Sequence, residues 1–283
     1  MVQTVNLTLG EALNKASLFL KASGLDEHLA RTYWMMTFEQ TLTDVVLGLN
    51  KPVKEEMYTH YMRILEQIVE GKPIQYLLGH AYFMEGKFKV TEHTLIPRED
   101  TAGIVSLSNH YLEEKVDAKV LDIGTGTGIL AIMIAKLNPE QHVFASDISP
   151  EALEVAKENA LNHQVNVEFI ESNLFEHIPQ QSFDLIVSNP PYISEDELDL
   201  MDDSVKKFEP SLALFAEDNG LAIYKQLAKQ IQSYVKETSM IIVEIGFQQG
   251  EAVKTIFSET FPNSTIEIIL DLNGKNRYVQ IEL

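Results

Sequence analysis

Residues 120–128 read Val-Leu-Asp-Ile-Gly-Thr-Gly-Thr-Gly, and Ile-Leu-Ala-Ile-Met follows at 129–133. A short, mostly apolar run that ends in glycines is typical of a buried strand turning sharply into a helix. Glycines let the backbone approach a ligand closely, and the N-terminus of the next helix favours an anionic group. The spacing is Gly-x-Gly-x-Gly, not the Gly-x-Gly-x-x-Gly of dinucleotide sites. This stretch therefore predicts a strand, a ligand-binding loop and a helix.

Apolar strand patterns alternate with helical patterns from residue 119 onward, which is typical of a parallel α/β sheet. Strands are predicted at residues 120–123, 142–146, 165–170, 183–188, 240–245, 265–270 and 277–283. The last two flank Asp271-Leu-Asn-Gly, a turn sequence that favours an antiparallel finish. The expected fold class is α/β, with a Rossmann-like sheet of seven strands that is mostly parallel.

The second and third strands end in side chains suited to a nucleoside. Asp147 follows the glycine loop by about 20 residues, where a carboxylate can accept both ribose hydroxyls; it can also be a helix cap ahead of Pro150. Asn173 can meet an adenine edge, and Leu174 can cover the ring. Asp122, beside the glycines, either faces an ammonium group or only organises the loop. These side chains should meet at the carboxyl edge of the sheet.

The fourth strand, residues 183–188, runs into Asn189-Pro190-Pro191-Tyr192. Two prolines fix φ and remove two backbone donors, so the strand must stop there. The side-chain carbonyl of Asn189 and the main-chain carbonyl of Pro190 can both accept from one planar NH₂ group, and the Tyr192 ring can lie on its face. The corner is predicted to hold an amide or a ring amine; the alternative is a plain Pro-Pro turn.

The first 70 or so residues predict a small helical bundle without a catalytic signature. A capping box at Thr8 to Glu11 starts one helix, a second covers about residues 27–40 with Trp34 in the core, and a third begins near Pro52 and ends at Gly71. Two short strands at 81–84 and 87–90 then form a hairpin. Asp100 or Thr101 is expected to cap the next helix, and Arg98 is either functional or an ordinary surface charge.

Length and composition limit the function. A chain of 283 residues suggests about two domains. The formal net charge of −20 argues against a partner held through its phosphates, and the lack of cysteine excludes disulfides and thiolate metal sites. No metal-ligand spacing, apolar run of membrane-spanning length or signal peptide is evident, so we expect a cytoplasmic protein without a metal.

A long, poorly periodic segment at residues 193–219 follows the fourth strand. Its start is crowded with acidic side chains, namely Glu195, Asp196, Glu197, Asp199, Asp202 and Asp203. The segment is either a solvated acidic face or a landing surface for a basic partner.

The glycine loop, Asp147 and the Asn189–Tyr192 corner, in that order, resemble class I S-adenosylmethionine-dependent methyltransferases that modify planar nitrogens. Further motifs narrow the resemblance to the bacterial release-factor glutamine methyltransferases. They are Pro73-Ile-Gln-Tyr-Leu-Leu-Gly79, Ile96-Pro97-Arg98, Glu209-Pro210, Leu212, Asp218 to Leu221 with Tyr224, Glu244-Ile-Gly246, and Asp271-Leu272 with Gly274 and Arg277. The similarity covers nearly the whole chain and is specific from Pro73 onward.

This resemblance implies methylation, by S-adenosylmethionine, of the glutamine amide in the Gly-Gly-Gln motif of peptide-chain release factors, with S-adenosylhomocysteine as the product. Together with the patterns above, the sequence predicts domains at residues 1–72 (helical bundle, partner recognition), 73–98 (hairpin connector) and 99–283 (catalytic). We expect a monomer, and the charge and the lack of an apolar span predict no stable complex with nucleic acid or membrane. The substrate site would be Asn189, Pro190, Pro191 and Tyr192. The cofactor site would be Arg98, Asp122, Gly124, Thr125, Gly126, Gly128, Asp147, Ile148, Asn173, Leu174 and Asn189.

Two residues depart from the family pattern: Glu99 stands where a second proline is usual, and Asn173 where Asp is usual. Three other functions compete. The substrate could be a glutamine of a ribosomal protein or the exocyclic amine of adenine in nucleic acid, or the chain could be a non-catalytic nucleoside-binding scaffold. The charge disfavours the nucleic acid reading.

Overall fold

The computed structural model describes residues 7–283, so the N-terminal residues on which the absence of a signal peptide was judged lie outside it. The chain forms two compact units. The first contains the residues up to Gly79 together with Asp203–Phe208, and the second contains His80–Asp202 and Glu209–Leu283. Within residues 7–283, no helix is both long enough and apolar enough to cross a membrane.

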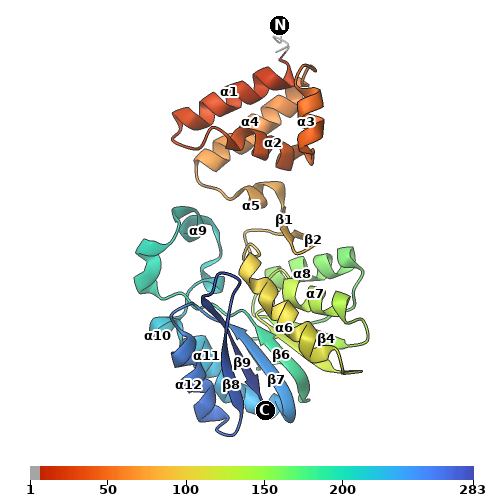
Figure 1. Ribbon diagram of the computed structural model, residues 1–283, viewed down its shortest axis with the longest axis vertical. Helices are drawn as coiled ribbons and strands as arrows, with labels where there is room; N and C mark the ends of the chain where they lie inside the picture. Colours follow the sequence, from red (N-terminus) through yellow and green to blue (C-terminus); the bar gives the residue numbers. More distant parts are fainter. Residues whose placement is uncertain (1–6) are drawn as a thin grey trace. The chain divides into compact units, whose positions relative to one another are not determined.

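The first unit is all helical (Figure 1). Its helices are α1 (Leu9–Ala22), α2 (Leu29–Phe38), α3 (Leu42–Gly48), α4 (Glu55–Val69), α5 (Ile74–Leu78) and α9 (Asp203–Phe208). The predicted capping box is confirmed, because the Thr8 hydroxyl accepts from the backbone N–H of Glu11 and the Glu11 carboxylate accepts from that of Thr8. Trp34 is buried against Tyr61, as expected of a core residue.

Two expectations for this unit are wrong in detail. Pro52 does not start a helix, since it pairs with Thr8 in an isolated β-bridge and α4 begins only at Glu55. The backbone N–H of Val53 donates to the carbonyl of Leu7, which keeps this segment extended. Helix α3 was not anticipated, although its start carries a second capping box between Thr41 and Asp44.

The second unit is built on the predicted seven-stranded sheet. Its strands are β3 (Lys119–Ile123), β4 (His142–Asp147), β5 (Glu168–Glu171), β6 (Phe183–Ser188), β7 (Val235–Glu244), β8 (Thr265–Leu270) and β9 (Asn276–Glu282), in the order β5-β4-β3-β6-β7-β9-β8. Neighbours from β5 to β7 run parallel, whereas β9 is antiparallel to β7 and to β8. The α/β fold class and the antiparallel last strand are confirmed.

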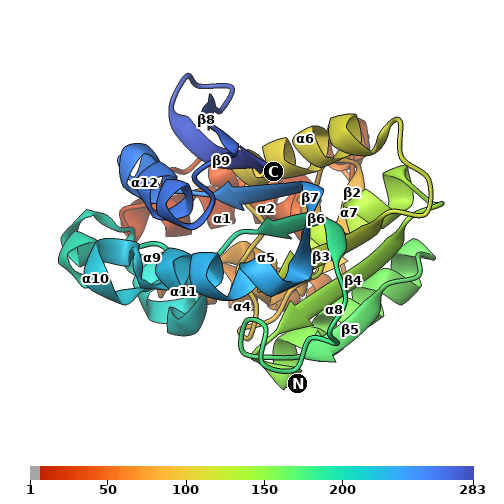
Figure 2. The same ribbon diagram turned by 90° about the horizontal axis from the view of Figure 1, so that it is seen from below.

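Helices cover both faces of this sheet. Helices α6 (Ala102–Leu112), α7 (Ile129–Leu137) and α8 (Pro150–His163) pack on the face that carries Val120 and Leu185. Helices α11 (Ala222–Ile231) and α12 (Gly250–Thr260) pack on the opposite face with Leu121 and Ile186. Figure 2 shows α6 and α11 on opposite sides of β7. All residues of α7 from Ile129 to Ala135 are buried, so this helix is fixed firmly behind the glycine loop.

The hairpin of β1 (His80–Phe83) and β2 (Gly86–Lys89) belongs to the second unit. Both strands begin one residue earlier than the sequence suggested. Asn159 of α8 binds β2 through its side chain, accepting from the backbone N–H of Lys89 at 2.7 Å and donating to its carbonyl at 3.0 Å. The same amide donates to the carbonyl of Thr127 at 2.9 Å, and thus joins the hairpin to the glycine loop.

The remaining segments are short: η1 (Glu99–Thr101), η2 (Glu195–Leu200), η3 (Ser211–Ala213), α10 (Glu217–Gly220) and η4 (Gln232–Tyr234). Residues 220–236 also show helical spacing, with Ile223, Leu227, Ile231 and Val235 on one side, and predict a helix over that range. Helix α11 ends at Ile231 instead, because strand β7 already begins at Val235. Helix α12 was not anticipated. Neither Asp100 nor Thr101 makes a side-chain cap bond, since the chain enters α6 through the 3-10 turn η1.

Candidate active site

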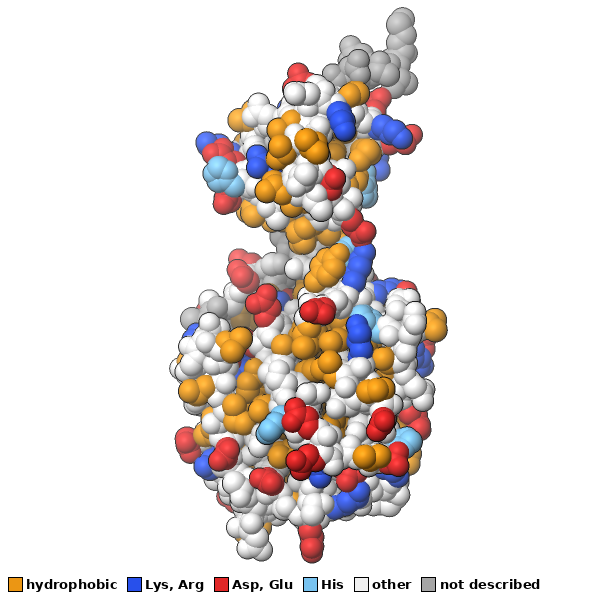
Figure 3. All heavy atoms as spheres, turned by 45° about the vertical axis from the view of Figure 1, so that its right-hand side comes forward, with side chains coloured by type: hydrophobic (Ala, Val, Ile, Leu, Met, Phe, Trp, Pro, Cys, Tyr) orange, Lys and Arg blue, Asp and Glu red, His pale blue; other side chains and the backbone are white. Residues whose placement is uncertain are grey.

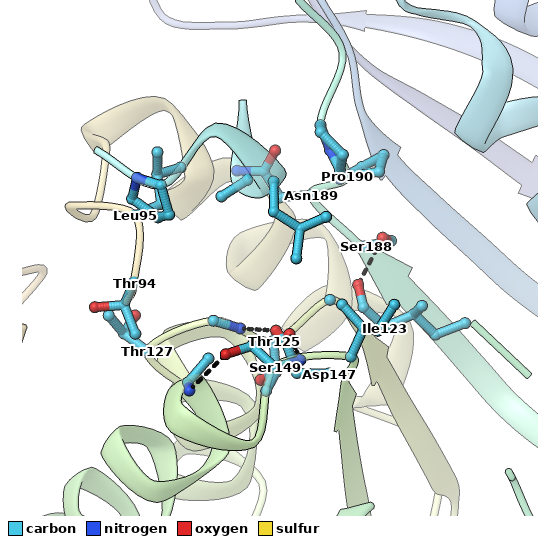
Figure 4. Close-up of a pocket in the computed structure, with 18 of the residues that line it drawn as sticks. Thr94, Leu95, Ile123, Thr125, Thr127, Asp147, Ser149, Ser188, Asn189 and Pro190 are labelled. Carbon is cyan, nitrogen blue, oxygen red and sulfur yellow. Dashed lines mark hydrogen bonds between the residues drawn. The ribbon is translucent and has the colours of Figure 1, made fainter. Parts of the chain in front are cut away.

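A cavity of about 280 Å³ lies at the carboxyl ends of β3, β4 and β6 (Figure 4). This is the edge where open α/β sheets bind ligands. It brings together most of the predicted site residues, namely Arg98, Gly124, Thr125, Gly126, Asp147, Ile148, Asn173, Leu174, Asn189, Pro190 and Pro191. Three predicted residues, Asp122, Gly128 and Tyr192, do not line it.

The glycine loop forms one wall of the cavity. Gly124 and Gly126 have φ angles of 72° and 55°, and a Cβ atom on either would meet no protein atom within 4 Å. Their open side leaves room for a ligand to approach the backbone. Gly128, with φ of 83°, differs because a Cβ there would come within 2.9 Å of Ile132 and 3.1 Å of Ala156. Gly128 is therefore required for the packing of α7 against α8.

The Asp147 carboxylate lies beside this loop. One oxygen accepts from the backbone N–H of Gly126 at 2.8 Å, and the other from that of Ser149 at 2.9 Å. Burial raises the pKa of Asp147, and these backbone donors oppose that shift. A carboxylate has about four acceptor positions, so these backbone donors leave room for a hydroxyl donor of a ligand. The geometry fits a ribose.

Asp122 lies beneath the loop instead of in the cavity. It is fully buried, and one carboxyl oxygen accepts from the Thr125 hydroxyl at 2.5 Å and from the Ala131 backbone at 3.3 Å. Burial raises the pKa of Asp122 to about 7. Of the two roles left open for this residue, the geometry favours organising the loop.

Side chains after β4 and β5 form the next part of the wall. Ile148 is half exposed, and Leu174 has a φ of 50°. Asn173 donates through Nδ2 to the Glu176 carboxylate at 3.0 Å, so its amide nitrogen already has a partner. An apolar surface with one polar edge suits a flat heteroaromatic ring.

The Asn189–Tyr192 corner lies across the cavity from Asp147 and Ser149 (Figure 4). The Nδ2 atom of Asn189 donates to the Thr101 hydroxyl at 3.1 Å. Tyr192 points away from the cavity, with its hydroxyl donating to Glu244 Oε1 at 3.4 Å, and burial raises its pKa. Tyr192 is not among the residues that line the cavity, so the contact of its ring with a substrate stays a prediction.

Arg98 also lines the cavity and pairs with Glu209, with 2.6 Å between Nη2 and Oε1. The Glu209 carboxylate is buried and accepts from the backbone N–H of Ile96 at 3.2 Å as well. The ion pair therefore joins the wall at residues 96–98 to the segment that starts at Glu209. The motifs Ile96-Pro97-Arg98 and Glu209-Pro210, which lie far apart in the sequence, are thus in contact.

Several residues of the cavity wall were missed from the sequence. They are Glu92, His93, Thr94, Leu95, Pro97, Thr101, Ile123, Thr127, Ile129, Leu130, Ser149, Ala152, Ser172, Ser188, Pro210, Leu212, Ala213 and Ile223. Many come from loops without a motif, although Pro97, Pro210 and Leu212 belong to motifs that the sequence analysis had noted. Loop conformation, which composition does not encode, brings the rest to the cavity.

Comparison with known proteins agrees with this geometry. The family model described as methyltransferase small domain matches residues 103–214, and the PrmC N-terminal domain model matches residues 11–79. Fold, glycine loop and carboxyl-edge cavity thus define an S-adenosylmethionine-dependent methyltransferase. The chain is 40% identical to the release factor glutamine methyltransferase of Enterococcus faecalis, over 94% of this chain and 96% of that protein. It is 42% identical to the release factor glutamine methyltransferase of Lactococcus lactis subsp. lactis, over 90% of this chain and 89% of that protein. The chain belongs to the release factor glutamine methyltransferase family.

Proposed function

We propose that this enzyme methylates the side-chain amide nitrogen of the glutamine in the Gly-Gly-Gln motif of peptide-chain release factors. The observation that carries the proposal is the placement of Asn189 and Pro190 in one cavity with the glycine loop and Asp147. A holder for a planar NH₂ group and a nucleoside site then face each other. A methyl donor and a primary amide can meet in that space.

The cofactor supplies a methyl group on a positively charged sulfur. We propose that the Asp147 carboxylate accepts the ribose hydroxyls and that Leu174, Ile148 and Asn173 contact the adenine. Gly124, Thr125 and Gly126 would hold the amino acid end by close backbone contact. Arg98, fixed by Glu209, would close the cavity wall beside it.

The protein's own part in the reaction is to hold and polarise the amide. The amide nitrogen of glutamine is a poor nucleophile because its lone pair is delocalised. Two acceptors, Asn189 Oδ1 and the Pro190 carbonyl, would take its two N–H bonds and aim the nitrogen at the methyl group. Positioning of this kind can supply a large part of a rate enhancement. Pro191 keeps the corner rigid, and Tyr192 supports it from behind.

The charge distribution agrees with a protein substrate. On the face shown in Figure 3, Lys and Arg side chains are scattered among acidic ones and form no continuous stripe. With 22 basic and 42 acidic residues, the chain is poorly suited to hold duplex DNA and flip a base.

Methyl transfer from labelled S-adenosylmethionine tests the proposal. Substrates would be a purified bacterial release factor, its variant with the Gly-Gly-Gln glutamine changed to alanine, ribosomal protein and duplex DNA. We expect label on the unchanged factor alone. Equal labelling of the alanine variant would overturn the proposed site, and labelling only of ribosomal protein or DNA would overturn the proposed substrate.

A further inference from the structure

Directly behind the Asn189–Tyr192 corner lies a buried carboxyl group with no role in the function proposed above. Glu244 ends strand β7 and is 1% exposed. Its Oε1 accepts from the Tyr192 hydroxyl at 3.4 Å, whereas Oε2 is buried with no hydrogen-bond partner within the usual distance. Burying a carboxyl oxygen without a hydrogen-bond donor destabilises the folded protein, so the position of Glu244 behind this corner calls for an explanation.

Thr101 connects this carboxyl group to the catalytic corner. Its hydroxyl accepts from Asn189 Nδ2 at 3.1 Å, and interaction with the same hydroxyl lowers the pKa of Glu244. A hydroxyl has one hydrogen to donate, and the Glu244 carboxyl group behind Thr101 has a buried oxygen, Oε2, that still lacks a donor. This arrangement allows a chain of donors from the Asn189 amide through Thr101 to Glu244.

The direction of this chain follows from the chemistry of its last member. An ionised carboxylate only accepts hydrogen bonds, so within such a chain Thr101 donates to Glu244 and accepts from Asn189, as the Asn189–Thr101 hydrogen bond already shows. The amide of Asn189 must then present Nδ2 to Thr101. Its Oδ1 is left for the cavity, which Asn189 lines.

We propose that Glu244 and Thr101 are positioning residues that hold the Asn189 amide with its nitrogen toward Thr101 and its oxygen toward the substrate. The inference rests on the proposed role of Asn189 as the acceptor for a substrate N–H. A flipped amide would present N–H to N–H, which repels the substrate group that the site must hold. Thr101 also lines the cavity, whereas Glu244 does not, and the role proposed for both is to fix the orientation of Asn189.

Other charged and titratable groups surround Glu244. Asp100 lies in η1, Arg277 and Tyr278 in β9, and Tyr224 in α11 donates to the Glu244 main-chain carbonyl at 2.7 Å. Arg277 pairs with Asp100 at 3.3 Å and favours the ionised carboxylate, whereas burial and Asp100 oppose it. On balance burial raises the pKa of Glu244 to about 7. Below that pH the protonated acid can donate to Thr101 and reverse the chain.

Thr101→Val removes the hydroxyl at nearly constant shape, and Thr101→Ser retains it. We expect Thr101→Val to lower kcat by about 10- to 100-fold, the usual cost of misplacing a group that orients a reactant. The dissociation constant for S-adenosylmethionine and the midpoint of thermal unfolding should change little. Thr101→Ser should restore most of the rate. Thr255→Val, an exposed Thr-to-Val change on α12, is the matched control.

Glu244→Gln tests the direction of the chain, because the glutamine amide can donate to Thr101. We expect a loss of kcat similar to that of Thr101→Val. In the wild type, kcat should fall as the pH drops below about 7, as Glu244 becomes protonated. In Glu244→Gln that fall should be absent. A wild-type rate in either variant, or a Thr101→Ser enzyme as slow as Thr101→Val, would overturn the proposal.

A readout that needs no turnover separates this proposal from the proposed function. In protein labelled with ¹⁵N at asparagine, the side-chain NH₂ signals of Asn189, assigned by their loss in Asn189→Ala, should shift in Thr101→Val and Glu244→Gln and remain in place in Thr255→Val. Unshifted signals would contradict the positioning role even if release factor is methylated. Shifted signals with no methylation of the factor would contradict only the proposed substrate.

Discussion

Asn189 and Asp147 stand on opposite walls of one cavity, so their replacement should separate catalysis from cofactor binding. We expect Asn189→Ala to lower kcat by about 100-fold or more, because an acceptor aimed at the reacting group is lost. Its affinity for S-adenosylmethionine should stay within a few fold. Asp147→Ala should weaken cofactor binding by at least about tenfold, since hydrogen bonds to a charged group are lost.

Calorimetric titration with S-adenosylmethionine, beside rate assays at saturating cofactor, checks this division. The two variants should fail in different measurements. An equal loss of cofactor affinity in both would show that the two walls do not act separately.

Burial of Asp122 gives a second prediction, on stability. Its folded-state pKa of about 7 lies above the ordinary value, so the folded protein holds this proton more tightly than the unfolded chain. This group therefore makes folding less favourable as the pH rises from about 4 to about 7, and its effect is constant above that range. Asp122→Asn does not titrate. We expect its free energy of unfolding, relative to wild type, to increase over that pH range.

Urea unfolding at several pH values and constant salt checks this prediction. The difference between the two proteins should level off above about pH 7. A difference that is independent of pH would mean that Asp122 is ionised throughout.

The residue types and their order in the sequence predicted much of the site, but the positions of some of these residues were predicted wrongly. The glycines, Asp147 and Asn189 were identified because their chemistry needs those residue types next to a strand end. Asp122 and Gly128 stand in the same motif, yet one is buried under the loop and the other packs against Ala156. Which face of a loop a side chain takes depends on packing with helices elsewhere in the sequence, and a motif does not contain that information. For the same reason Thr101 was taken for a helix cap.

At the scale of elements, the hairpin β1–β2 depends on one buried amide. Asn159 makes three hydrogen bonds, to both backbone groups of Lys89 and to the carbonyl of Thr127. We expect Asn159→Ala to cost about 2–3 kcal/mol of unfolding free energy, because buried backbone groups lose their partners. Thermal or urea unfolding measures this cost. Asn159→Asp, which keeps an acceptor but loses both donors, should not recover the wild-type value; full recovery would contradict the role of the Nδ2 bonds.

The acidic start of the segment after Tyr192 gives a prediction on association. Asp196, Glu197 and Asp199 in η2 are exposed. If they attract a basic surface of the substrate, the affinity for release factor should fall as salt rises, because salt screens exposed charges. Neutralising the three residues to Asn, Gln and Asn should flatten that dependence. The double variant Glu251→Gln, Glu259→Gln on α12 is the control. A wild-type affinity that does not change with salt would contradict attraction by the acidic residues of η2.

Strands were easier to predict than helices here. Each of the seven strands was identified because a strand of this sheet is a short apolar run between breaks in the pattern, whether it is parallel, as from β5 to β7, or antiparallel, as at β9. Several helices, among them α3 and α12, were not predicted, and α11 was predicted to extend beyond Ile231. A short helix such as α3 shows less than two turns of periodicity, and no local signal marks the change from Ile231 to the strand at Val235.

For the whole molecule, we propose that the helical unit recognises the partner and that the second unit suffices for cofactor binding. Every residue that lines the cavity belongs to the second unit. We expect residues 80–283, with 203–208 replaced by a short Gly-Ser linker, to bind S-adenosylmethionine within a few fold of the full chain. Methylation of whole release factor should fall by at least about tenfold in kcat/KM, a loss of about 1.4 kcal/mol. Titration and rate assays check this, and an unchanged kcat/KM would contradict partner recognition by the bundle.

The place of α9 in the first unit has a consequence for biosynthesis. Most of that unit lies before Gly79, yet α9 comes from residues 203–208, after four strands of the sheet have been made. Domains generally fold as they emerge during synthesis, N-terminal ones first. The core of the leading helices contains no residue of α9, so these helices can bury it before α9 is made. The bundle is thus translated first, but its last helix can join only after the ribosome has released the chain beyond Phe208.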